Sequence, residues 1–102
     1  MACNLSKYEL YILKRIIYDK SRWCNKHISR EDLSSGTPVD KRHLYREAID
    51  SLIRKGYLKQ YKSQNRVDVC ADKSLKHQFI NFFRMHESEH LFLQGLDFSR
   101  MK

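Results

Sequence analysis

The segment from His86 to His90, which reads HESEH, carries the side chains whose spacing most resembles a catalytic motif. Two histidines four residues apart on a helix, with a glutamate after the first, form the H-E-x-x-H arrangement by which many metallopeptidases bind zinc and activate water. The motif raises the hypothesis of a metal-dependent hydrolase that uses His86, Glu87 and His90.

A zinc hydrolase also needs a third protein ligand and a walled substrate cleft. The extended metallopeptidase motif requires a glycine at position 93 and a histidine at position 96, and both positions are leucine. We therefore expect neither enzyme activity nor a cofactor, and we expect both histidines on the polar face of an exposed helix. A regulatory zinc or nickel site built on His86 and His90 is the alternative.

The charge of the chain favours a polyanionic partner. A length of 102 residues suits a single domain, and 20 Lys and Arg residues against 12 Asp and Glu residues leave a formal net charge of +8. Basic side chains that neutralise phosphates release condensed counterions, which makes nucleic acid the expected partner.

The three cysteines, Cys3, Cys24 and Cys70, show no C-x-x-C spacing. Because an odd number cannot form a self-contained disulfide framework, and the spacing suits no cysteine-rich zinc site, we expect reduced thiols. No leader pattern opens the chain, and the apolar runs are too short to cross a membrane. A cytoplasmic location is therefore expected, since reduced thiols are the rule there.

Three helices are expected in the first half of the chain. Ser6 and Glu9 have the spacing of a capping box, which predicts a helix from about residue 7 to about residue 20. A short helix should follow Ser29 and stop at Ser35-Gly36. The pair Thr37-Pro38 then starts a third helix, which should run to Lys55 and be closed by Gly56.

After Gly56 the pattern changes to the alternation of strands. Residues 57–62 and 67–71 alternate, and the turn-like residues 63–66 separate them, so we expect a β-hairpin. A last amphipathic helix should start at about Ser74, weaken near Ser88 and end by Gly95. The expected fold class is therefore mainly α with a small β-hairpin.

Two stretches resemble a known family. Residues 28–33 read ISREDL, which looks like the start of the second helix of winged-helix proteins, a branch of the helix-turn-helix proteins. Residues 44–58 read LYREAIDSLIRKGYL and are similar to that family's recognition helix, with the glycine that lets the chain turn into the first wing strand. The resemblance covers residues 5–72 and implies a winged helix-turn-helix core, to which residues 73–98 add a C-terminal amphipathic helix.

The resemblance implies binding to double-stranded DNA, with residues 37–55 in the major groove and residues 59–66 on the backbone. The side chains expected to contact DNA lie in the first half of the third helix and on the hairpin: Lys41, Arg42, His43, Tyr45, Arg46, Lys59, Lys62 and Arg66. Tyr45 lies near the apolar face, so packing in the core is an equal alternative for it. Glu47 and Asp50 share the outward side of the helix and oppose phosphate.

Proteins of this family usually bind DNA as two-fold dimers, and the last helix is the expected interface because it carries apolar residues on more than one face. The interface is predicted to contain Phe79, Phe82, Phe83, Leu91 and Phe92. The alternative is a helix that folds back to complete its own core. The expected function is that of a homodimeric, sequence-specific transcription regulator. A module that binds protein or RNA without reading DNA is the rival.

Overall fold

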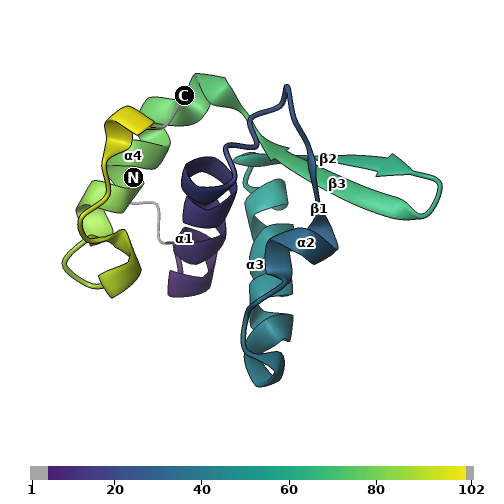
Figure 1. Ribbon diagram of the computed structural model, residues 1–102, viewed down its shortest axis with the longest axis horizontal. Coiled ribbons are helices and arrows are strands. Elements are labelled where there is room, and N and C mark those ends of the chain that lie inside the picture. The colour runs from purple at the N-terminus through teal and green to yellow at the C-terminus, as the bar shows by residue number, and fades with distance from the viewer. Residues whose placement is uncertain (1–4, 101–102) are drawn as a thin grey trace.

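Four helices and a three-stranded antiparallel sheet form the part of the chain that the computed structural model describes, residues 5–100 (Figure 1). The helices are α1 (Lys7–Lys14), α2 (Arg30–Ser34), α3 (Arg42–Arg54) and α4 (Lys76–His86). The strands are β1 (Ile28–Ser29), β2 (Leu58–Ser63) and β3 (Arg66–Ala71). The described residues also contain one π turn, η1 (Arg15–Asp19), and four 3-10 turns: η2 (Val39–Lys41), η3 (Lys73–Leu75), η4 (Leu91–Leu93) and η5 (Phe98–Arg100).

The predicted hairpin is present, but it belongs to a larger sheet in which β3 lies between β1 and β2. Leu58 pairs with Ala71 at the base of the hairpin, and Ser63 pairs with Arg66 near its tip. The third strand was not predicted because two residues show no alternation. It forms where Ile28 pairs with Val69 and both side chains are buried. The domain is therefore mixed α and β.

The first helix begins as predicted. The Ser6 hydroxyl accepts a hydrogen bond from the Glu9 backbone at 3.1 Å, and the Glu9 carboxylate accepts one from the Ser6 backbone at 2.9 Å. The regular α-helix ends earlier than expected, at Lys14, and continues as the wider π turn η1. In that turn the Lys20 backbone donates to the Arg15 carbonyl at 2.9 Å.

The core lies where α1 is enclosed by α3 on one side and α4 on the other (Figure 1). It is lined by fully buried side chains from all three helices: Leu10, Leu13, Ile49, Leu52, Phe79 and Phe83. Among residues 5–100, no helix is both long enough and apolar enough to cross a bilayer.

Cys24 and Cys70, which are 46 positions apart in the sequence, form a disulfide with their Cα atoms 4.9 Å apart. The expectation of reduced thiols is therefore wrong for this pair. The fold lays the loop after η1 along β3, where the Ala71 backbone donates to the Arg22 carbonyl at 3.0 Å. That contact is tertiary, so cysteine spacing did not reveal it. Cys3 lies outside the described residues.

The buried carboxylate of Glu9 joins α1 to α3. It accepts hydrogen bonds from the Lys55 ammonium and from the Ser51 hydroxyl, each at 2.8 Å. Burial raises the pKa of Glu9, but the hydrogen bonds from Lys55, Ser6 and Ser51 outweigh it and hold the pKa below its ordinary value of 4.5.

We expect Glu9→Gln to lower the free energy of unfolding by about 1–3 kcal/mol at about pH 7, because it leaves the bonds to Lys55 and Ser51 weakened. The folded pKa is lower than the unfolded one, so the carboxylate stabilises the fold above pH 4.5 and loses this effect as pH falls through the folded pKa. The difference in free energy of unfolding between the wild type and Glu9→Gln, measured by urea denaturation, should therefore be smaller at about pH 3 than at about pH 7. Glu47→Gln, an exposed acid on α3, is the control, and an equal cost of Glu9→Gln at both pH values would contradict the assignment.

Candidate nucleic-acid interface

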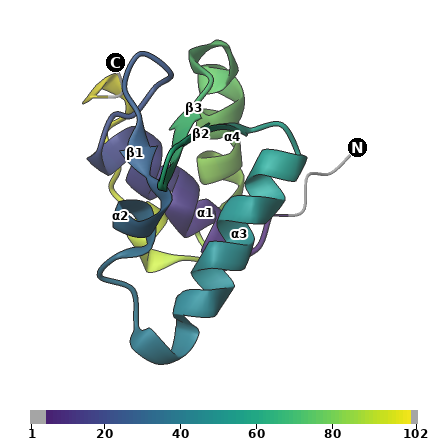
Figure 2. The same cartoon turned by 90° about the vertical axis from the view of Figure 1, so that its right-hand side faces the viewer.

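Two elements project from the domain, and they carry most of the residues predicted to contact DNA. The first turns of α3 extend beyond α1 and α2 (Figure 2), and the β2–β3 hairpin extends away from the helices (Figure 1). The side chains of His43 and Arg46 on α3 are exposed, and so is that of Lys41 in the turn η2 directly before it. Lys59, Lys62 and Arg66 are exposed on the hairpin.

Arg42, which was predicted to contact DNA, is half-buried, and its side chain folds back onto the turn before α3. Its guanidinium donates to the Thr37 carbonyl at 2.9 Å and to the Thr37 hydroxyl at 3.3 Å. Thr37 is buried and donates in turn to the Ser34 carbonyl at 2.6 Å. Arg42 therefore stabilises the turn between α2 and α3. The exposed basic side chains next to it are those of Lys41 and His43.

Tyr45 packs between two tyrosines of α1. Its ring lies edge-on to the rings of Tyr8 and Tyr11, with centroid separations of 5.0 and 5.1 Å. Burial raises the pKa of its hydroxyl, and Tyr11 and Tyr8 raise it further. Such aromatic pairs stabilise the contact between helices beyond the area they bury, so Tyr45 joins α3 to α1.

The hairpin cations differ in how far their charge is already neutralised. The Lys59 ammonium lies 3.5 Å from an Asp72 carboxylate oxygen, and the Arg66 guanidinium binds Asp68. Lys62 makes no ion pair with any described residue. Lys62 is therefore the hairpin cation most available to a phosphate.

An ion pair that the sequence did not predict changes the charge of α3. The Arg30 guanidinium of α2 binds the Asp50 carboxylate at 2.6 Å and lies 3.4 Å from the Arg46 carbonyl. Asp50, which opposed phosphate in the sequence interpretation, is thus neutralised, and Glu47 remains exposed. No sequence rule couples two residues 20 positions apart on different helices.

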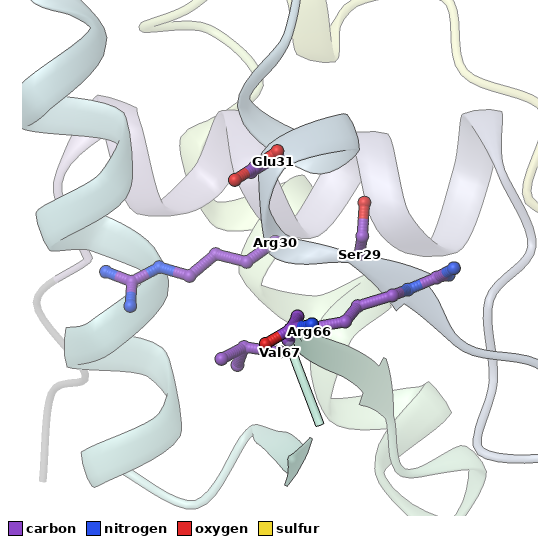
Figure 3. Close-up of a pocket in the computed structure, with 6 residues that line it drawn as sticks. Ser29, Arg30, Glu31, Arg66 and Val67 are labelled. Atoms are coloured by element: carbon purple, nitrogen blue, oxygen red, sulfur yellow. The ribbon is translucent and has the colours of Figure 1, made fainter. Parts of the chain in front are cut away.

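A pocket of about 310 Å³ lies between the start of α2 and the tip of the hairpin (Figure 3). In Figure 3 the Arg30 side chain reaches toward α3, whereas that of Arg66 points the opposite way. Both arginines bind acids, so their charge is already balanced. The pocket is lined by Ser29, Arg30, Glu31, Asn65, Arg66 and Val67.

The HESEH segment does not form the helical motif that its spacing suggested. Helix α4 ends at His86, and His90 has an extended backbone, so the expectation of both histidines on one helix face is wrong. Glu87 is the C-terminal cap of α4, and the Glu89 backbone donates to the His86 carbonyl at 3.0 Å, so the chain turns away after His86. His86 instead lies 3.2 Å from the Glu89 carboxylate, and no group of three or more His, Cys, Asp or Glu side chains in residues 5–100 is placed to hold a metal ion.

The residues predicted at a dimer interface are divided between the core and the surface. Phe79, Phe82 and Phe83 are buried within their own chain, and Phe92 is half-buried. Leu91 is 84% exposed. The apolar side of α4 therefore completes the core of its own domain, which was the alternative that the sequence left open.

Comparisons with known protein families, with characterised proteins and with solved structures find no match to this chain. Of the predicted DNA-binding residues, His43 and Arg46 are exposed on α3 and Lys41 is exposed in η2. On the hairpin, Lys62 makes no ion pair with any described residue. Arg42 and Tyr45 are held by contacts within the fold.

Proposed function

We propose that this chain is a winged-helix protein that binds double-stranded DNA, with α3 in the major groove and the β2–β3 hairpin as a wing on the backbone. The order of elements supports the proposal, since α2 and α3 follow a first helix and a short strand, and the hairpin comes next. The observation that carries it is the start of α3, where His43 and Arg46 are exposed, Lys41 is exposed in the turn η2 directly before them, and Arg30 neutralises Asp50.

This arrangement suits the geometry of B-form DNA. The major groove admits one α-helix, and an arginine on that helix can donate to both acceptors of a guanine. A flanking lysine such as Lys62 contributes by neutralising a phosphate and releasing counterions. In this proposal Arg46 contacts base edges, and Lys41 and Lys62 contact the backbone.

Control of transcription is the role that we propose for this binding. Homodimerisation and a cytoplasmic location stay predictions. Three of the phenylalanines predicted at the dimer interface are buried within their own chain, which weakens the case for the dimer. The disulfide weakens the case for a cytoplasmic location, because structural disulfides are typical of oxidising compartments.

A salt series with mixed-sequence duplex DNA tests the proposal. We expect affinity to fall steeply with salt, and a Lys41→Ala/Arg46→Ala variant to bind about 10–100-fold more weakly. Its salt slope should be smaller by about one, because Lys41 is the residue of this pair that contacts a phosphate. The matched control is Lys20→Ala/Lys73→Ala, which removes the same charge from exposed positions outside α3 and the hairpin.

Equal losses in the two double variants would show that net charge alone drives binding, without a role for α3. Negligible duplex binding at low salt would overturn the DNA proposal, and the protein- or RNA-binding module would then be the better reading.

A further inference from the structure

We propose that Val39 recognises thymine, by contact of its side chain with the C5 methyl group in the major groove. This inference rests on the proposed function and adds a base preference to it. It assigns a specificity role to a residue that neither charge nor motif had marked.

Val39 is 80% exposed, so its side chain is accessible to a ligand. It lies in η2, the single turn directly before α3, two positions from the exposed Lys41. Figure 2 shows this end of α3 extending beyond the rest of the domain. If α3 enters a major groove, Val39 enters with it.

The turn that presents Val39 is held firmly. The Arg42 guanidinium donates to the Thr37 carbonyl, and the Lys41 backbone donates to the Pro38 carbonyl at 3.0 Å. The ring of Pro38 restricts its own φ angle, and a β-branched side chain such as valine has few rotamers. Little conformational freedom is therefore lost when Val39 makes a contact, which favours binding.

The chemistry of the groove selects the partner. The thymine methyl is the apolar group that base edges present in the major groove, and aliphatic side chains contact it. Asp40 is exposed in the same turn and repels phosphate, so its neighbour Val39 is better suited to base edges, while Lys41 at the end of the turn contacts the backbone. Val39 can supply the apolar contact at that position.

The test compares alternating dA-dT duplex with the same duplex containing deoxyuridine, which lacks only the methyl group. We expect the wild-type protein to bind the thymine duplex about fourfold more tightly, the effect of burying one methyl group. In Val39→Ala this ratio should fall toward one, with affinity for the deoxyuridine duplex unchanged. Leu91→Ala, which truncates another exposed apolar residue away from α3, should keep the wild-type ratio.

Any effect of the methyl group on duplex shape is present for both proteins, so the difference between the two ratios measures the contact itself. Equal ratios for wild type and Val39→Ala, with salt-dependent binding intact, would overturn the role of Val39 and leave the DNA proposal standing. Absence of binding to both duplexes at low salt would overturn both.

Discussion

Replacing Cys24 and Cys70 together by alanine is expected to lower the free energy of unfolding by about 4 kcal/mol. The bond joins residues 46 positions apart, and a cross-link over a loop of that length removes much of the entropy of the unfolded chain. The loss is large relative to the total stability of a small domain, so the variant should be partly unfolded at physiological temperature.

Urea denaturation with and without a thiol reductant measures this effect. The reductant should lower the midpoint of the wild-type protein to that of the variant and leave the variant unchanged. Thiol titration of the unfolded, unreduced protein should find one reactive thiol among the three cysteines, that of Cys3. A wild-type midpoint that does not respond to reductant would contradict a stabilising disulfide.

The disulfide also has a local consequence. It holds the loop before β1 against the sheet, and in that loop the ring of His27 stacks on the ring of Tyr61 in β2, with centroids 4.4 Å apart. Loss of the bond should therefore first loosen the loop and the base of the hairpin, while the contact between α1 and α3 persists.

Phe79→Ala is expected to destabilise the domain by about 3–5 kcal/mol, the usual cost of truncating a fully buried phenylalanine. The Phe79 ring lies 6.3 Å from that of Trp23 and 6.1 Å from that of Tyr57, so it joins α4 to the loop after η1 and to the start of the hairpin. The matched control is Met85→Ala on the same helix. Met85 is 59% exposed, and we expect its truncation to cost less than about 1 kcal/mol.

This pair of variants also separates the two roles considered for α4. If α4 completes its own core, the unfolding midpoint of Phe79→Ala falls by the same amount at every protein concentration. If α4 instead forms a dimer interface, the wild-type midpoint depends on concentration, and Phe79→Ala shifts sedimentation toward the monomer. The burial of Phe79 leads us to expect the first result.

Features that depend on neighbouring residues were determined by the sequence itself. The capping box of Ser6 and Glu9 starts α1 as its spacing predicts. Gly56 closes α3 with a φ of 85°, a value that suits glycine, and the Tyr57 backbone donates to the Leu52 carbonyl at 3.0 Å. The alternation after Gly56 produced both hairpin strands. In each case the interacting groups lie within a few positions, so local rules are sufficient.

Other features were decided only when distant parts of the chain met. Strand β1 exists because β3 is beside it, and the pairing of Cys24 with Cys70 depends on the same approach of loop and strand. The neutralisation of Asp50 by Arg30 and the burial of Phe79 likewise arise between separate elements. Composition and periodicity report which residues can be buried or charged. The contact partner of each such residue depends on the path of the whole chain, so only the tertiary structure determined it.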